Sequence, residues 1–84
     1  MIRNYVLVDL RDKNERNVGF IQESISIPAV EIKRDRIPNV IYDLKNEKNT
    51  LIIVYSSNDR DAIATANHLY EKGYDNIYLL TGGI

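Results

Sequence analysis

The 84-residue sequence contains no cysteine and no tryptophan, and it has a single histidine, His68. Without cysteine there can be no disulfide framework and no thiolate ligand for a metal. No apolar run approaches the roughly 20 residues that a membrane-spanning helix needs. Residues 1–4 lead directly into an apolar segment and lack the profile of a signal peptide. These absences favour a cytoplasmic protein without bound metal or cofactor.

The chain also lacks an excess of charge of either sign. It has 11 basic and 12 acidic residues, for a net charge of −1. Nucleic acids and anionic membranes are bound through strongly basic patches, so neither is expected as a partner. With 44% hydrophobic residues the composition is that of an ordinary globular protein. The length predicts one small domain, residues 1–84, which buries only about 60% of its unfolded surface.

Four short apolar segments predict strands, at residues 5–10, 24–27, 51–55 and 77–80. A helix is predicted from near Asp61 to Lys72, with Ile63, Ala66, Leu69 and Tyr70 on its apolar face. Gly73 follows at the position where a left-handed backbone ends a helix.

Between these segments the pattern is weaker. Residues 11–17 are polar and predict a loop with one helical turn, and residues 30–44 predict one or two short helices divided by Pro38. Strands that alternate with helices predict an α/β fold. We expect a small, mainly parallel sheet with helices on both faces.

Five motifs occur in an order that resembles the rhodanese-like domain family across nearly the whole chain. They are Asp9-Leu10-Arg11, Gly19-Phe20-Ile21, Ile25-Ser26-Ile27-Pro28, Ile52-Ile53-Val54-Tyr55, and the ending Gly73-Tyr74-Asp75-Asn76-Ile77-Tyr78-Leu79-Leu80-Thr81-Gly82-Gly83. The family also has helices before the first strand and after the two final glycines, and here both are missing. The chain is therefore expected to be a core excerpt or a minimal version of the domain.

The resemblance places Ser56 at the position of the family's catalytic cysteine. The family loop reads Cys-x-x-Gly-x-Arg-Ser/Thr, and here Asp59 replaces the glycine, Asp61 the arginine and Ala62 the hydroxyl residue. We expect a degenerate loop with no catalytic residue, formed by Ser56, Ser57, Asn58, Asp59, Arg60 and Asp61.

Rhodanese chemistry carries sulfur on a cysteine thiolate, which forms readily because a helix N-terminus lowers the pKa of the thiol. A serine hydroxyl is far less acidic and needs an adjacent base. His68 is expected on the polar face of the helix, roughly 10 Å or more from the start at 1.5 Å per residue. It is therefore too distant to activate Ser56.

Electrostatics also argue against an anion at this loop. A helix N-terminus attracts anions through its free N–H groups and its dipole. Asp59 or Asp61 is expected to be the N-cap and to accept those N–H groups internally. A phosphate or thiosulfate would then meet repulsion that Arg60 offsets only in part.

Three other features have ordinary structural explanations. Asp9 and Arg11 are expected to form a structural ion pair at the end of the first strand. Asp9 with Asp12 suggests a magnesium site only if a second strand ends in an acid, and Tyr55 stands there instead. Gly82 and Gly83 predict a tight turn, since no P-loop lysine follows.

The sequence therefore predicts a catalytically inactive module that binds protein or serves as a structural part of an assembly. The acidic loop with an early arginine resembles a centrosomal and ciliary branch of the family, which implies a cytoskeletal or ciliary partner at the centrosome or cilium. Two alternatives stay open. One is a sulfurtransferase whose natural cysteine has been replaced by Ser56 in a recombinant version. The other is a regulatory docking domain of a larger enzyme.

Overall fold

The computed structural model describes residues 4–47 and 49–80. In chain order its elements are β1 (Asn4–Asp9), α1 (Lys13–Val18), β2 (Ile25–Ser26), α2 (Ala29–Lys33), α3 (Asn39–Tyr42), β3 (Thr50–Tyr55), α4 (Asp59–Glu71) and β4 (Ile77–Leu79). The predicted turn at Thr81, Gly82 and Gly83 lies outside the described residues. In the part of the chain that is described, no helix is long and apolar enough to cross a membrane.

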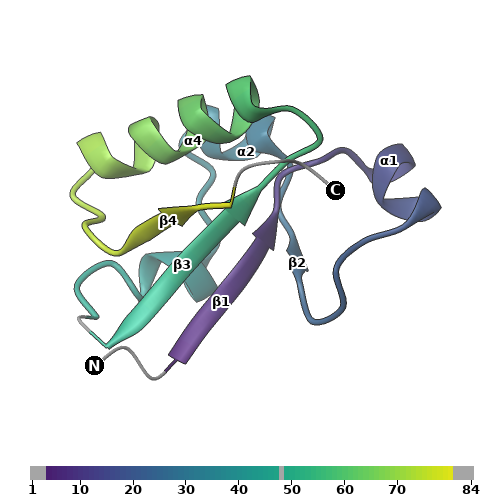
Figure 1. The fold of residues 1–84 in the computed structure, drawn as a ribbon. Helices are drawn as coiled ribbons and strands as arrows, with labels where there is room; N and C mark the ends of the chain where they lie inside the picture. The colour runs from purple at the N-terminus through teal and green to yellow at the C-terminus, as the bar shows by residue number, and fades with distance from the viewer. Residues whose placement is uncertain (1–3, 48, 81–84) are drawn as a thin grey trace.

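The four strands form one sheet in the order β2-β1-β3-β4, and all neighbouring pairs are parallel (Figure 1). The register pairs Val8 with Val54 on β3 and with Ile25 on β2. This confirms the predicted α/β class and the parallel sheet. Because the strands are parallel, the residues that follow β1 and β3 meet at the same edge, which we call the carboxyl edge.

One apolar cluster holds the sheet to the helices. Its strand members include Val8, Ile52 and Val54, which are at most 1% exposed. The buried apolar side chains of the helices belong to this cluster, and they are Ala29, Ile32, Ile41, Ala62 and Leu69. In Figure 1, α2 and α4 lie together over one side of the sheet. The opposite side carries Leu7, Leu51 and Ile53, which are half-buried.

The buried face of α4 differs from the predicted one. Ala62, Thr65 and Leu69 are at most 1% exposed, whereas Ile63 and Tyr70 are 45% and 70% exposed. Of the four residues predicted on the apolar face, Leu69 is buried and Ala66 packs against the core, so the prediction is confirmed for two of them. Small side chains at positions 62 and 65 let the helix lie close to the sheet, and the larger apolar side chains lie toward its flank. The hydrophobic periodicity of the sequence does not indicate that small side chains of α4 lie against the sheet.

The predicted break at Pro38 and the predicted end of α4 at Gly73 are confirmed. Pro38 separates α2 from α3 and stands at the N-cap of α3. At the end of α4, Gly73 has a φ of 98°, and its N–H donates to the carbonyl of Tyr70 at 3.0 Å. A residue with a Cβ is rarely stable at that φ, so glycine is required there.

Candidate functional site at the carboxyl edge

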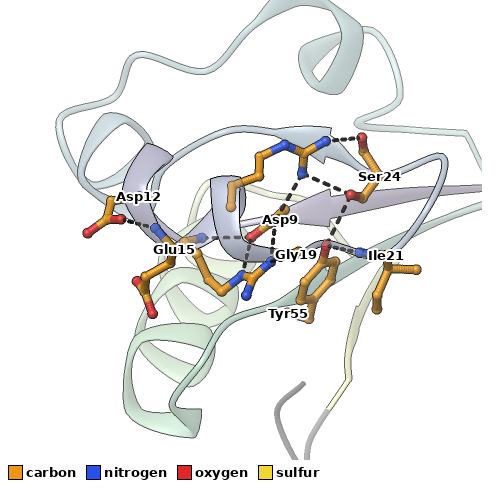
Figure 2. Close-up of polar contacts among 9 residues, drawn as sticks. Asp9, Asp12, Glu15, Gly19, Ile21, Ser24 and Tyr55 are labelled. Carbon is orange, nitrogen blue, oxygen red and sulfur yellow. Dashed lines mark hydrogen bonds and ion pairs between the residues drawn. The ribbon is translucent and has the colours of Figure 1, made fainter.

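The end of β1 is occupied by a buried ion-pair network centred on Asp9 (Figure 2). The Asp9 carboxylate is fully buried and accepts hydrogen bonds from Arg11 Nε at 3.2 Å and Arg16 Nη1 at 2.9 Å. Arg11 also donates to the carbonyl of Gly19, which fixes the loop after α1. The predicted pair of Asp9 and Arg11 is thus present, with Arg16 as a second partner.

These contacts set the ionisation of the network. Burial opposes the charged form of Asp9, but hydrogen bonds from Arg11 and Arg16 outweigh it and hold the pKa of Asp9 below its ordinary value. The hydrogen bond from Arg11 to Asp9 in turn raises the pKa of Arg11. Asp9 is therefore a permanent counter-ion and is unsuited to accept a proton from a substrate near neutral pH.

The last residue of β3 joins the same network. Tyr55 is fully buried, and its hydroxyl donates to Ser24 Oγ at 3.0 Å and accepts from the Ile21 N–H at 3.3 Å. Arg16 also bonds Ser24, through the Oγ at 2.9 Å and the carbonyl at 2.9 Å. Figure 2 shows the Tyr55 ring directed at the Ile21–Ser24 segment. The ends of β1 and β3 are thus tied to the chain that leads into β2.

The loop after β3 has a different character. Ser56 is 4% exposed, whereas Ser57, Asn58, Asp59 and Arg60 are exposed. The N-cap of α4 is Asn58, whose side chain accepts from the Asp61 N–H at 2.9 Å. The prediction that Asp59 or Asp61 is the cap is wrong. The helix begins at Asp59, two residues earlier than expected, so both aspartates lie in its first turn.

The two aspartates still make the start of α4 acidic. A carboxylate in the first helical turn interacts favourably with the helix dipole. Asp61 also lies 3.6 Å from Lys33 Nζ in an exposed ion pair and accepts from Asn58 Nδ2 at 3.3 Å. The positive end of the helix is therefore already compensated by the protein's own side chains.

Ser56 borders a small cavity of about 180 Å³ between the end of β1, the start of α2 and the first turn of α4. One cation and three carboxylates line it, namely Arg11, Asp12, Glu15 and Asp61. The Arg11 guanidinium is paired with Asp9, 3.2 Å from its Nε atom. An oxyanion entering this space would be repelled, which is the reverse of what a phosphate or sulfur-oxyanion site needs.

The histidine is not available as a base for Ser56. His68 Nε2 lies 2.8 Å from Asp35 Oδ1, and Lys72 Nζ lies 3.4 Å from the same oxygen. The hydrogen bond from His68, assisted by Lys72, lowers the pKa of Asp35. His68 is therefore held by an acidic partner away from the loop. It is engaged in a surface cluster with the segment that follows α2.

The magnesium-binding interpretation also finds no support in the geometry. Asp9 is neutralised by two arginines, and Asp12 caps α1 by accepting from the Glu15 N–H at 2.8 Å. Within residues 4–47 and 49–80, no group of three or more acidic, histidine or cysteine side chains could hold a metal ion.

Sequence reasoning did not identify Arg16 or the Tyr55 hydroxyl as members of the network. A partial signal was present in Asp12 and Glu15, whose spacing is that of a helix start with an acidic cap. That signal predicts α1, and a helix there places Arg16 one turn further on. Nothing in the sequence pattern indicates that Arg16 turns inward to Asp9.

These features define an α/β domain with a parallel sheet and a strand-loop-helix turn at its carboxyl edge. The rhodanese-like domain family model matches residues 1–84. The chain belongs to the rhodanese-like domain family.

The similar curated proteins include several centrosomal proteins of 41 kDa. The zebrafish (Danio rerio) protein is 32% identical over 82 residues, and the human (Homo sapiens) protein is 30% identical over the same length. Each alignment covers 95% of this chain but only 22% of the relative. A tRNA uridine(34) hydroxylase of Erwinia tasmaniensis is 30% identical over 79 residues, covering 94% of this chain and 22% of that protein.

Solved structures agree with the fold. The rhodanese-like domain of an Anabaena protein superposes with a TM-score of 0.74 at 26% identity, covering 95% of this chain and 85% of that one. A human single-domain sulfurtransferase superposes with a TM-score of 0.75 at 16% identity, covering 96% and 78%. The second likeness is one of fold alone.

Proposed function

We propose that this domain is a catalytically inactive rhodanese-like module that binds protein or serves as a structural part of an assembly. The observation that carries the proposal is Ser56, which the family resemblance places at the cysteine position and which borders a cavity lined by three carboxylates. Sulfane sulfur is carried as a persulfide on cysteine, and a serine oxygen cannot take that role.

The surroundings of Ser56 support the same proposal. Serine becomes a nucleophile when a base lies within hydrogen-bonding reach. The one histidine of the sequence, His68, is paired with Asp35 instead. The first turn of α4 contributes Asp59 and Asp61, which disfavour an anionic substrate.

The relatives support a proposal for the cellular location of the module and for the kind of partner it binds. Proteins named as centrosomal align with almost the whole chain, so we propose a cytoplasmic role at the centrosome or cilium with a cytoskeletal protein as partner. The chain spans about a fifth of the length of these relatives. Docking or regulation on behalf of a larger protein is therefore part of the proposal. The net charge of −1 argues against nucleic acid as the ligand.

One competing function is a sulfurtransferase in which a natural cysteine has been replaced by Ser56. The similarity to a protein named as a tRNA hydroxylase favours an enzyme of some kind. The acidic residues Asp59 and Asp61 count against it, because a replacement of the nucleophile alone would leave the rest of an anion-binding loop intact.

The test measures thiosulfate:cyanide sulfur transfer and phosphate-ester hydrolysis by three proteins: the native chain, Ser56→Cys, and Ser56→Cys combined with Asp59→Gly and Asp61→Arg. We expect no turnover by the native chain, at most a trace with Ser56→Cys, and more when the two acids are also removed. Turnover by the native chain would refute the proposal. Efficient turnover by Ser56→Cys alone would favour the competing function.

A further inference from the structure

An exposed apolar pair lies beside the acidic cavity. Val18 at the end of α1 is 91% exposed, and Phe20, two residues later, is 53% exposed. Together with Arg11, Glu15 and Gly19 they line a shallow hollow of about 440 Å³. Apolar side chains gathered around a hollow, rather than scattered singly, are typical of a surface that contacts another molecule.

The Phe20 ring is held in place. The Arg16 guanidinium carbon lies 4.1 Å from the ring centroid. Arg16 is itself fixed by Asp9 at 2.9 Å and by Ser24 at 2.9 Å. A ring backed by an anchored guanidinium loses little freedom when a partner covers it, and this pre-organisation favours binding.

The hollow and the Ser56 cavity adjoin each other, because Arg11 and Glu15 line both. Figure 2 shows Asp12 and Glu15 together at the start of α1. Across the two spaces the lining charges are Asp12, Glu15 and Asp61 against Arg11. Arg11 is only 8% exposed and pairs with Asp9, and three carboxylates outnumber it among the charged residues that line these spaces. The rim that a partner meets is therefore negative.

The rim carboxylate Asp61 has an exposed cationic partner, Lys33. Lys33 lies 3.6 Å from Asp61, and both side chains are 44% exposed. Exposed pairs of this kind contribute little free energy. An incoming lysine or arginine can replace Lys33 without breaking buried structure.

We propose that these residues form a docking surface for a linear segment of another protein in which a large apolar side chain stands next to lysine or arginine. We call it the Phe20 surface, and it consists of Asp12, Glu15, Val18, Phe20 and Asp61. The apolar side chain contacts Val18 and Phe20, and the cation reaches the carboxylates. A phosphorylated or acidic segment would be repelled by the same rim. The inference rests on the proposed protein-binding function and names the surface and the chemistry of the partner.

The test selects binders to the 84-residue chain from a display library of random linear peptides. Enriched peptides are synthesised, and their dissociation constants are measured against native protein and variants. Phe20→Ser has a matched control in Tyr78→Ser, since both aromatic side chains are 53% exposed and Tyr78 lies on β4. Glu15→Lys has a matched control in Glu71→Lys, at the far end of α4. Circular dichroism verifies that each variant is folded.

We expect the library to enrich peptides that combine a large apolar residue with lysine or arginine. Their affinity should fall by about tenfold or more with Phe20→Ser and with Glu15→Lys, a change of about 1.4 kcal/mol. The two controls should leave it within about twofold. Affinity should also fall with added salt, because the rim charges are exposed to solvent.

Enrichment of acidic peptides, or an absence of enrichment, would overturn the inference. So would peptides whose binding is lost with Tyr78→Ser and kept with Phe20→Ser, although the proposed protein-binding function would then survive at another surface. Sulfur transfer by the native chain would instead refute the proposed function itself.

Discussion

The ends of β1 and β3 lie side by side at one edge of the sheet, but their polar residues serve different purposes. After β1, Asp9 is buried and paired with two arginines, and it holds the surrounding loops. In the loop after β3, the side chains of residues 57–60 are exposed, and the contacts of this region include the Asn58 cap and a surface ion pair of Asp61. The first region stabilises the fold. The second is where the family places chemistry, and here it contributes little to stability.

The largest expected effect in this comparison comes from Asp9→Ala. Removing one partner of a buried ion pair leaves uncompensated charge on Arg11 and Arg16, which costs about 3–5 kcal/mol. Urea unfolding followed by circular dichroism measures the loss. Asp59→Ala, in the first turn of α4, should cost at most about 1 kcal/mol. Equal losses at the two positions would contradict the distinction between the two regions.

The stability difference between native protein and an Asp9 variant should also depend on pH. Because the pKa of Asp9 is lowered in the folded protein, its stabilising contribution is present above the unfolded value near pH 4 and is lost as pH falls through the folded pKa. Asp9→Asn should therefore differ most from native protein at neutral pH and least in acid. The free energy of unfolding that is lost when Asp9 is protonated in acid cannot exceed the free energy that is lost when Asp9 is removed. A constant difference across this range would show that Asp9 is not the titrating group.

A smaller effect is expected from Tyr55→Phe. The change removes the hydroxyl that bonds Ser24 and the Ile21 N–H and leaves the buried ring in place. The expected cost is about 1–2 kcal/mol. Tyr78→Phe, with a ring that is 53% exposed, is the control and should be neutral. If both variants are neutral, the link between β3 and the chain before β2 is not a stabilising one.

The smallest expected effect is that of Asn58→Ala, which removes the N-cap of α4 and should cost about 1 kcal/mol. Asn67→Ala, at an exposed position inside the same helix, should be neutral or slightly stabilising. Thermal unfolding of the two variants measures the difference. A greater cost for Asp59→Ala than for Asn58→Ala would indicate that an aspartate caps the helix after all.

The sequence pattern predicted the sheet well, because four apolar segments separated by helical or turn signals allow few arrangements. It also located the Ser56 loop, because that loop must follow the β3 segment at the carboxyl edge. The sequence pattern was less successful for features that depend on tertiary contacts. The orientation of α4 depends on which side chains are small enough to lie against the sheet, namely Ala62 and Thr65.

Two further details depended on geometry that a single sequence does not contain. The N-cap of α4 moved to Asn58 because aspartate and asparagine are nearly equal as caps, so a run of such residues leaves the start of the helix ambiguous. The role of Arg16 depends on a long side chain turning back across a loop to Asp9. The hydrophobic periodicity of the sequence does not indicate which residue the Arg16 side chain contacts.

The most direct test of the central claim is a titration of the native domain with thiosulfate, and separately with phosphate, followed by amide chemical shifts. If the loop after β3 no longer handles anions, the amides of residues 56–61 should show no saturable shift with either ion. The double substitution Asp59→Gly and Asp61→Arg serves as the matched variant and should gain binding. Saturable shifts at Ser56 and its neighbours in the native protein would contradict the account.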